Sequence, residues 1–319
     1  MNEFEIIEHY FKDLTGLDSR VVCGIGDDAA LVEVPAGQEL AVSVDTLVSG
    51  VHFHGDVDPN TLGYKALAVN LSDLAAMGAQ PAWVTLALTL PGHEAAWLEG
   101  FSSGFADLAR RHGVSLIGGD LTRGPMSITV QVMGLCDSGQ AIKRAGAEVD
   151  DDIYISGYPG EAGYALALLT GPKGRNDIES THCLERLLKP QPRVALGCAL
   201  RGIAHAAIDV SDGLAADLGH ILTASGVGAV IELERIPLRP PLSGVQENGR
   251  RWDFILGSGD DYELCFTVPE ARRGQMQGIM DALDYPVSRI GKITAGSGTC
   301  FMQADGSEYH SPGSGFMHF

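Results

Sequence analysis

The sequence has few basic residues and lacks long apolar runs. Lysine and arginine number 22 against 41 aspartates and glutamates, which gives a formal net charge of −19. An excess of negative charge repels nucleic acids and anionic membranes, so we expect no partner of either kind. No apolar run reaches the ~18 residues that a membrane span needs. If the substrates are phosphates, cations must bridge them to the protein.

Paired cysteines are missing as well. None of the six cysteines lies in a C-x-x-C pair, and several fall within apolar segments. This usage is typical of reduced thiols in a cytosolic protein. The N-terminal segment Met1–Glu5 is acidic, whereas a secretory signal begins with basic residues. The expected location is therefore the cytoplasm.

Several familiar motifs are absent. The chain has no G-x-x-x-x-G-K-[ST] phosphate loop and no G-x-S-x-G nucleophile elbow. Gly24–Ala29 matches the dinucleotide-binding fingerprint in outline. However, Asp27 and Asp28 occupy the place of the pyrophosphate, and strand-like residues before Pro35 stand where a helix should begin. His52–His54 lacks a third ligand at a zinc spacing, and a histidine that binds phosphate or lies on the surface fits it better.

The length of 319 residues predicts about two domains. Strand and helix patterns interleave in both halves, which favours an α/β or α+β fold. The polar, turn-rich stretch 146–152 is the best boundary, so we expect domains at 1–145 and 146–319. Strands are expected at 40–45, 82–90, 114–117, 127–135, 153–156, 206–210, 229–233, 262–268, 287–293 and 299–303. Helices are expected at 3–14, 60–77, 94–112, 162–170, 180–188, 193–204, 214–224 and 270–283.

Five aspartate-bearing loops share one pattern, and in three of them the aspartate (Asp45, Asp120 or Asp209) is expected at the end of an apolar strand. A strand end holds a carboxylate rigidly at the crevice where open α/β sheets bind ligands. Mg²⁺ takes one or two carboxylates together with water and phosphate oxygens. One such loop alone is ordinary turn or helix-cap chemistry, but five together predict a magnesium site for ATP phosphates. The five are Gly24–Asp28, Ser43–Thr46, Asn70–Asp73, Gly118–Thr122 and Asp209–Gly213.

Two further segments have two interpretations each. Gly157–Gly163 lies between a strand and a helix, so its amides could hold a phosphate, or it could be a tight turn at Glu161. Lys143 and Arg144 form a rare basic pair in an acidic chain. They are either a surface pair or a contact to an ATP phosphate, for which the planar guanidinium is suited.

Taken together, these motifs resemble the thiamine-monophosphate kinase family over essentially the whole chain. The family belongs to a superfamily with aminoimidazole ribonucleotide synthetase, selenophosphate synthetase and a hydrogenase-maturation protein. The resemblance implies a two-domain fold with an N-terminal sheet domain that dimerises and a C-terminal α/β domain. The motifs that carry it are Gly24–Ala30, Ser43–Val48, His52–Phe53, Tyr64–Ala79, Gly118–Asp120, Asp209–Leu214, Asp261–Leu264 and Gly315–Phe319.

The resemblance also implies an activity: ATP phosphorylates thiamine monophosphate to thiamine diphosphate by direct in-line transfer, the last step of thiamine diphosphate biosynthesis. ATP would be the co-substrate, several Mg²⁺ ions the cofactors, and a homodimer the assembly. No residue would act as a general base. Another ATP-using member of the superfamily and a non-catalytic protein that binds Mg-nucleotide are the alternatives.

The implied site residues fall into three groups. The metal ligands would be Asp28, Ser43, Val44 through its main chain, Asp45, Asp73, Asp120, Asp209 and Asp212. The ATP contacts would be Gly119, Asp120, Arg144 and Ser211. The substrate contacts would be His52, Asp260 and Phe316, with Phe316 packed on the thiamine rings.

Two positions depart from the family pattern. Asp260 stands where the family often has glutamate and is one methylene shorter, so its contact to substrate is either weaker or made through water. Val44 stands where relatives carry a hydroxyl residue, so only its main-chain carbonyl could bind a metal.

Overall fold

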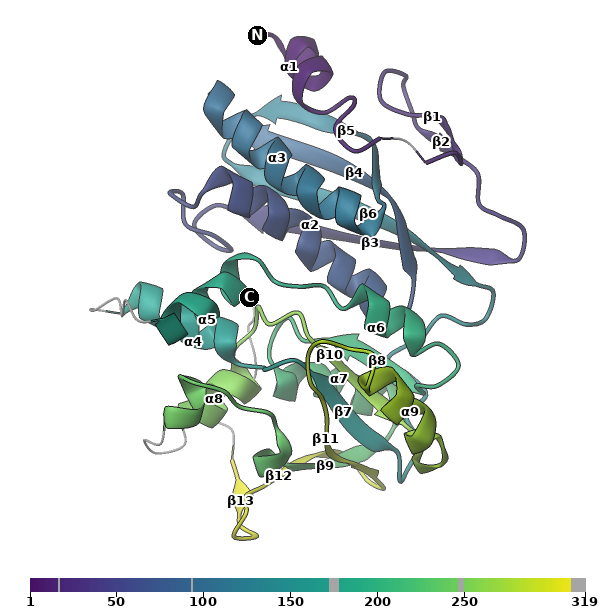
Figure 1. Ribbon diagram of the computed structural model, residues 1–319, viewed down its shortest axis with the longest axis vertical. Coiled ribbons are helices and arrows are strands. Elements are labelled where there is room, and N and C mark those ends of the chain that lie inside the picture. The colour runs from purple at the N-terminus through teal and green to yellow at the C-terminus, as the bar shows by residue number, and fades with distance from the viewer. Residues whose placement is uncertain (17, 93, 172–177, 246–249, 311–319) are drawn as a thin grey trace. The chain divides into compact units, whose positions relative to one another are not determined.

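The computed structural model describes residues 1–16, 18–92, 94–171, 178–245 and 250–310 (Figure 1). The chain forms two compact units. The first comprises Met1–Leu74 and Ala79–Gln140, and the second comprises Ala75–Gly78 and Ala141–Phe319. The chain passes between them at Gln140 and Ala141, five residues before the expected boundary. In the described residues, no helix is both long and apolar enough to cross a membrane.

The first unit is built on a four-stranded mixed sheet. Its order is β3 (Gln38–Val48), β6 (Ser127–Asp137), β4 (Gln80–Leu90) and β5 (Ser115–Arg123). β6 runs antiparallel to both β3 and β4, while β5 runs parallel to β4. A parallel pair needs a crossover, and α3 (Ala95–His112) supplies it. β5 is therefore an edge strand of this sheet.

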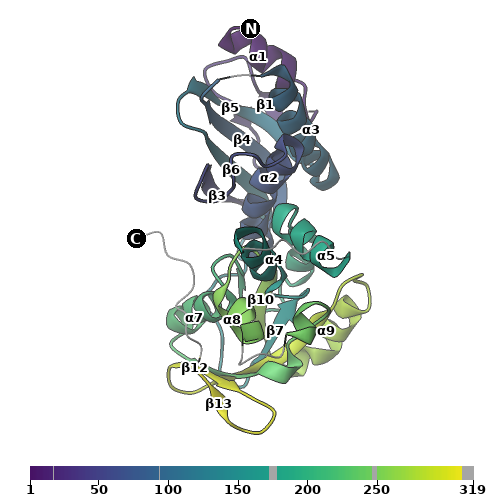
Figure 2. The same cartoon turned by 90° about the vertical axis from the view of Figure 1, so that its left-hand side faces the viewer.

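Helices α2 (Pro59–Ala76) and α3 cover one face of this sheet (Figures 1 and 2). Glycines let the two helices approach closely. A Cβ at Gly63 would lie 2.0 Å from the carbonyl oxygen of Phe101, and one at Gly104 would lie 1.8 Å from that of Asn60. Leu67, which is fully buried on α2, belongs to the core beneath this contact. The close packing holds α2 firmly against the strands that carry site residues.

The opposite face of the sheet is partly open. β1 (Val21–Cys23) and β2 (Leu31–Val32) pair and pack on the buried ring of Trp83 and on Ile117. Along β3 the side chains of Leu40, Val42, Val44 and Val48 are exposed. Alternate residues of a strand share a face, so these side chains form one apolar row. We call this row the β3 row.

Helix α1 (Glu3–Tyr10) begins with a reciprocal cap. The Asn2 side chain accepts the Glu5 N–H at 3.0 Å, and the Glu5 carboxylate accepts the Asn2 N–H at 2.9 Å. Such a capping box fixes the start of a helix. The helix ends at Tyr10, four residues earlier than the sequence predicts.

The second unit contains a seven-stranded sheet with helices around it. Neighbouring strands are antiparallel except β12 and β9, which are parallel. The strand order is β13 (Glu308–Tyr309), β12 (Gly298–Met302), β9 (Gly228–Glu232), β11 (Val287–Thr294), β7 (Asp152–Ser156), β10 (Leu264–Val268) and β8 (Ala206–Asp209). The helices are α4 (Glu161–Thr170), α5 (Ile178–Leu188), α6 (Val194–Ala199), α7 (Leu214–Ser225), α8 (Arg250–Gly257) and α9 (Arg273–Met280), with short 3-10 turns at Leu233–Arg235, Leu242–Gly244 and Glu270–Arg272.

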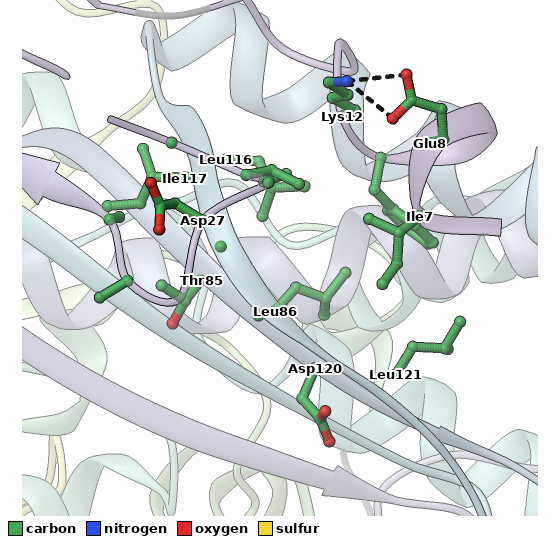
Figure 3. A pocket seen from close by; sticks show the side chains of 18 of the residues that line it. Ile7, Glu8, Lys12, Asp27, Thr85, Leu86, Leu116, Ile117, Asp120 and Leu121 are labelled. Atoms are coloured by element: carbon green, nitrogen blue, oxygen red, sulfur yellow. Dashed lines mark hydrogen bonds and ion pairs between the residues drawn. The ribbon is translucent and has the colours of Figure 1, made fainter. Parts of the chain in front are cut away.

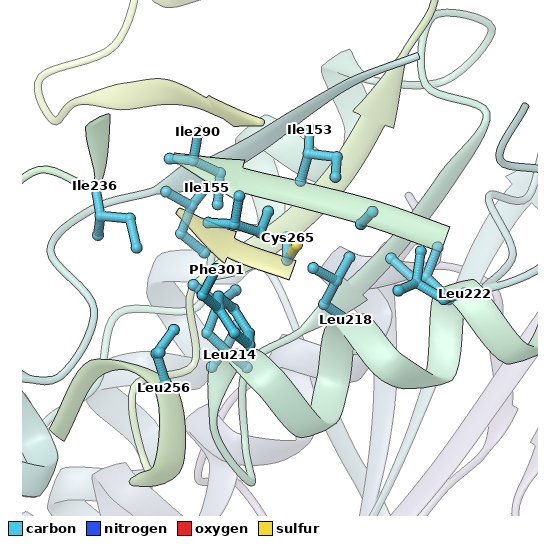
Figure 4. Packing of buried hydrophobic residues seen from close by; sticks show 14 of the residues in the cluster. Ile153, Ile155, Leu214, Leu218, Leu222, Ile236, Leu256, Cys265, Ile290 and Phe301 are labelled. Carbon is cyan, nitrogen blue, oxygen red and sulfur yellow. The ribbon is translucent and has the colours of Figure 1, made fainter. Parts of the chain in front are cut away.

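Helix α7 supplies much of the core of this unit. Leu214, Leu218 and Leu222 recur every four residues, which places them on one helix face. Figure 4 shows this face against strand residues that include Ile153 and Cys265. Because α7 begins directly after Ser211–Gly213, its packing anchors that loop to the sheet.

The mixed fold with two domains of helix and sheet is confirmed, but two further elements differ from their predicted bounds and one helix was missed. The strand expected at 114–117 continues to Arg123 as β5, because Gly118–Asp120 pairs with β4. The helix expected at 193–204 is only the short α6. Helix α8 was not predicted, because arginine and glycine around it mask its buried face of Trp252, Ile255 and Leu256.

Candidate active site

Strand β3 and helix α2 bring two of the expected metal ligands together. The Ser43 hydroxyl donates to a carboxylate oxygen of Asp73 at 2.6 Å. The main-chain N–H of Asp45 donates to the side-chain oxygen of Asn70 at 3.0 Å, and the Asn70 amide donates to the Ala66 carbonyl at 3.0 Å. Asn70 is fully buried, so it fixes β3 to α2 at this point. Asn70 is not among the expected site residues, although an asparagine one helical turn before Asp73 in an apolar helix is a signal, because buried polar groups need partners.

Asp45 and Asp120 lie inside strands rather than at strand ends, which corrects the prediction. Direct pairing joins Thr46, Thr129, Ala87 and Asp120 across the sheet, and these residues share the open face. Asp45 directly precedes Thr46 in β3, so its side chain points to the opposite, helix-covered face. Both carboxylates are exposed. The two carboxylates therefore do not converge on one face of the sheet.

Gly119 lies beside Asp120 and tolerates no side chain. Its φ is +155°, and a Cβ there would lie 1.9 Å from the carbonyl oxygen of Leu86 on β4. β5 is an edge strand, so the open face and the helix-covered face of the sheet adjoin each other along it. A cavity of about 720 Å³ lies there, lined by β4 and β5 residues including Asp120, by α1 and by the loop Gly24–Ala30 (Figure 3).

The loop Gly24–Ala30 presents two exposed carboxylates. The side chain of Asp27 accepts the main-chain N–H of Asp28 at 2.9 Å and lies 3.7 Å from the Cys23 sulfur. Asp27 thus shapes the loop, and it lines the cavity together with Asp28, an expected metal ligand. Gly119 and Asp120 line the same cavity. Three expected site residues are therefore neighbours here.

His52 lies in the turn after β3. Its Nδ1 accepts the main-chain N–H of Val48 at 3.0 Å. An accepting Nδ1 carries no hydrogen, so in the neutral ring the hydrogen is on Nε2. That tautomer gives a donor suited to a phosphate oxygen.

In the second unit, Asp209 ends β8 and is followed by the loop Ser211–Gly213. The main-chain N–H groups of Ser211, Asp212 and Gly213 all donate to one carboxylate oxygen of Asp217, at 3.0, 3.0 and 3.1 Å. Asp217 is 2% exposed. Burial raises the pKa of Asp217 to about 6, with the nearby charge of Asp212 acting in the same direction against the three amide bonds.

The segment Ser258–Tyr262 packs against that loop. Asp260 and Tyr262 have positive φ values of 69° and 51°, a conformation that costs non-glycine residues energy. The Asp260 N–H donates to the Ser211 carbonyl at 2.9 Å, and the Tyr262 hydroxyl donates to the Asp260 carboxylate at 3.2 Å. A Cβ at Gly259 would lie 2.0 Å from the same Ser211 carbonyl. Ser211 and Asp260, one expected ATP contact and one expected substrate contact, are therefore held side by side.

The two acids after Asp260 are structural. The Asp261 carboxylate accepts the N–H groups of Gly160 and Ala162 at 2.6 and 3.4 Å, and burial raises its pKa well above the usual range. Glu263 forms a buried ion pair with Arg193 at 2.5 Å. Of the two interpretations of Gly157–Gly163, the tight turn is confirmed, because Asp261 occupies amides that a phosphate would need.

The remaining expected residues contribute less. Arg144 is exposed, and its main-chain carbonyl accepts a hydrogen bond from the Ser225 hydroxyl at 3.4 Å. Phe316 lies outside the described residues. Within the described residues, no group of three or more His, Cys, Asp or Glu side chains is arranged to hold a metal ion.

Asp217→Ala should impair activity without unfolding the second unit. The change leaves three N–H groups without an acceptor, of which that of Gly213 is buried and the other two are partly buried. A buried N–H without an acceptor costs roughly 1–3 kcal/mol unless the loop moves to reach water. We expect the Ser211–Gly213 loop to move and kcat/KM for ATP to fall at least ~10-fold. The exposed Asp281→Ala is the matched control. Wild-type kinetics for Asp217→Ala, measured on protein with a native circular dichroism spectrum, would remove this role.

Comparisons with known proteins place these features in a class. Residues 26–136 match the N-terminal domain and residues 149–302 the C-terminal domain of AIR synthase related proteins. The fold and its aspartate loops therefore define a two-domain protein of that class.

The particular family follows from full-length relatives. A thiamine-monophosphate kinase of Escherichia coli O157:H7 is 48% identical over 99% of this chain and 98% of its own length. The crystal structure of thiamine-monophosphate kinase from Stenotrophomonas maltophilia K279a is 45% identical, with a TM-score of 0.85 over 91% of this chain and 93% of that one. AaThiL, solved in complex with AMPPCP and TMP, is 30% identical, with a TM-score of 0.79 over 92% of both chains. The chain belongs to the thiamine-monophosphate kinase family.

Proposed function

We propose that this chain transfers the terminal phosphoryl group of ATP to thiamine monophosphate, giving ADP and thiamine diphosphate. The observation that carries the proposal is the match along 92% of both chains to AaThiL, a relative solved with AMPPCP and TMP. AMPPCP is an analogue of ATP in which a methylene group replaces the bridging oxygen before the last phosphate. ATP is thus the co-substrate and thiamine monophosphate the acceptor. The six cysteines are free thiols, which fits action in the cytoplasm.

The transfer requires no general base. The acceptor is a phosphate oxygen that is already anionic at neutral pH, so no proton has to be removed before attack. Catalysis then consists of positioning and charge stabilisation, as in phosphoryl transfer generally. We therefore infer a direct in-line displacement with no phosphorylated enzyme.

Mg²⁺ fits the donor chemistry of the aspartate loops. It prefers oxygen ligands and keeps several waters, with one or two carboxylates and substrate phosphates completing the shell. A cluster of three protein carboxylates is therefore unnecessary. Bound Mg²⁺ would neutralise the phosphates of the two substrates. The residues that would hold it are Asp28, Asp45, Asp73, Asp120, Asp209 and Asp212, with Ser43 and the carbonyl of Val44.

The chain's own groups would orient the two substrates. Gly119, Arg144 and Ser211 would contact ATP, with Gly119 allowing main chain to approach a phosphate. His52 would donate from Nε2 to the phosphate of thiamine monophosphate. Asp260, fixed against Ser211, would contact the same substrate, and Phe316 would pack on its rings.

Comparison of acceptors tests this function. Purified protein with Mg-ATP should release ADP only when thiamine monophosphate is present, and EDTA should abolish the release. Release with selenide or formylglycinamidine ribonucleotide instead would assign the chain to another superfamily activity. Binding of Mg-ATP without turnover on any acceptor would make it a nucleotide-binding protein.

We also propose that two copies of the chain associate through the β3 row. Val42 and Val44 are 51% and 55% exposed, and exposed apolar side chains that gather on one face of an edge strand indicate an interface. Val42→Asp should shift the protein from dimer to monomer in analytical ultracentrifugation, because a carboxylate would be buried without a partner. Val149→Asp, at an exposed valine of the second unit, should leave the dimer intact. A monomeric wild-type protein would contradict the proposal.

A further inference from the structure

A buried ion pair in the second unit has no part in the expected site. Arg193 directly precedes α6, and its guanidinium donates twice to the Glu263 carboxylate, at 2.6 and 2.5 Å. Arg193 is 4% exposed and Glu263 is 5% exposed. The guanidinium also lies over the ring of Tyr285, 3.7 Å from its centroid. A planar cation that makes two parallel hydrogen bonds and stacks on a ring is fixed in orientation, so this pair is a rigid anchor.

The Glu263 carboxylate is held from a second direction as well. The Ser156 hydroxyl, at the end of β7, donates to it at 2.5 Å and accepts the N–H of Leu264 at 2.9 Å. A Cβ at Gly157, whose φ is +61°, would lie 1.9 Å from the same carboxylate, so glycine at this position leaves room for it. Glu263 is therefore fixed both to Arg193 and to the end of β7.

Main-chain hydrogen bonds connect Glu263 to two of the expected contact residues. The Glu263 carbonyl accepts the Val210 N–H at 2.8 Å, and the Tyr262 N–H donates to the Val210 carbonyl at 2.8 Å. The Asp260 N–H then donates to the Ser211 carbonyl. Asp260 and Tyr262 have positive φ values, which non-glycine residues keep only where their surroundings hold them. The position of Asp260 thus depends on what holds the residues that follow it.

The expected ATP contact and the expected substrate contact have separate anchors. The loop Ser211–Gly213 is fixed by Asp217, which accepts its three N–H groups. Asp260 is fixed by the acid that follows it, which accepts N–H groups at the start of α4, and by the pair of Arg193 and Glu263. A change at Arg193 should therefore displace Asp260 and leave the loop in place.

We propose that Arg193 is a positioning residue for the phosphoryl transfer: through Glu263 it holds the Asp260 carboxylate where thiamine monophosphate binds. The inference rests on the proposed function and adds to it the residue that places the contact to the acceptor. An aspartate side chain is short, so a shift of the main chain at Asp260 moves its carboxylate by nearly the same distance. Arg193 is buried, so it acts through Glu263 and not by contact with the substrate.

Kinetics of Arg193→Lys test the inference. Lysine keeps the charge but cannot make two parallel hydrogen bonds to a carboxylate. A displacement of about 1 Å can cost ~10²-fold, so we expect kcat/KM for thiamine monophosphate to fall about 10- to 100-fold, mainly through KM. KM for Mg-ATP should stay within about twofold. Arg273→Lys is the matched control, since Arg273 donates twice to the fully buried Asp152 at the other end of β7.

A double-mutant cycle with Asp260→Ala shows whether Arg193 acts through Asp260. If it does, Arg193→Lys should change kcat/KM by less than about twofold once the Asp260 carboxylate is absent. An equal loss in both backgrounds would mean a general structural effect and would overturn the inference. A rise in KM for Mg-ATP that matches the rise for thiamine monophosphate would overturn it too. Glu263→Gln, a smaller change to the same pair, takes the place of Arg193→Lys if that variant does not fold.

Hydrogen exchange measured by mass spectrometry reports on the segment independently of turnover. In Arg193→Lys the amides of Asp260 and Tyr262 should exchange faster, whereas those of Ser211–Gly213 should keep the wild-type rate. Unchanged exchange at residues 258–263, with wild-type protein active on thiamine monophosphate, would overturn the positioning role alone. Absence of turnover by wild-type protein would instead refute the proposed function, and the inference would fall with it whatever the exchange rates.

Discussion

Asp120→Asn should reduce kcat/KM by about 10²–10³-fold, the size of effect seen when one charge-stabilising group is removed from a transition state. Asp120 is exposed on β5, next to the cavity and to the loop of Asp28. The carboxamide keeps the shape of the side chain but loses the negative charge that Mg²⁺ requires. We therefore expect the loss in activity together with a higher Mg²⁺ concentration for half-maximal rate.

The same change should have little effect on the stability of the fold. The β4–β5 ladder uses main-chain groups, and surface substitutions of this kind usually alter stability by less than ~0.5 kcal/mol. Asp107→Asn on α3, where the exposed carboxylate lies 3.7 Å from Arg110, is the control for loss of one negative charge. Normal turnover and normal Mg²⁺ dependence in Asp120→Asn would refute the metal role of this residue.

Gly119→Ala should strongly destabilise the first unit. The new Cβ would lie 1.9 Å from the Leu86 carbonyl oxygen, and alanine rarely adopts a φ of +155°. Because the obstructing atom is main chain, β5 must move away from β4. Backbone strain and overpacking together cost about 2–5 kcal/mol, and the displaced strand should also lose ATP binding.

Gly118→Ala is a control one residue away. A Cβ at Gly118 would meet only a methyl carbon of Thr85, at 3.9 Å, and its φ is not positive. Urea denaturation should therefore show a lowered midpoint for Gly119→Ala and a nearly unchanged one for Gly118→Ala. Equal midpoints for the two variants would mean that Gly119 is not constrained as described.

Much of the fold could be predicted because local patterns agree with it. The alternation of Ser127–Asp137 has the period of a strand, and the apolar segment Pro59–Ala76 has the length of a helix. The strand containing Gly118 and Gly119 was cut short, because two glycines normally end a strand. Here the strand continues through both glycines, and of the two only Gly119 must be glycine to fit against Leu86.

The site was predictable in its residue types but less so in its geometry. Short motifs identified Asp73 and Ser43, which are in direct contact. The motifs could not show that the side chains of Asp45 and Asp120 point from opposite faces of the sheet. The face to which a side chain points depends on the pairing between strands that are distant in sequence. Nor could they show that Asp217 holds the Ser211–Gly213 loop. An acid in the first turn of a helix is a usual cap, and its contact with three amides appears only in three dimensions.

The central claim is direct transfer of a phosphoryl group to thiamine monophosphate. Its most direct test is a single-turnover reaction with ATP labelled in the terminal phosphate, enzyme in excess, and separation of protein, thiamine diphosphate and inorganic phosphate over time. The account predicts that label passes from ATP to thiamine diphosphate with no labelled protein at any time. Label that appears first on the protein, or only in inorganic phosphate, would contradict it.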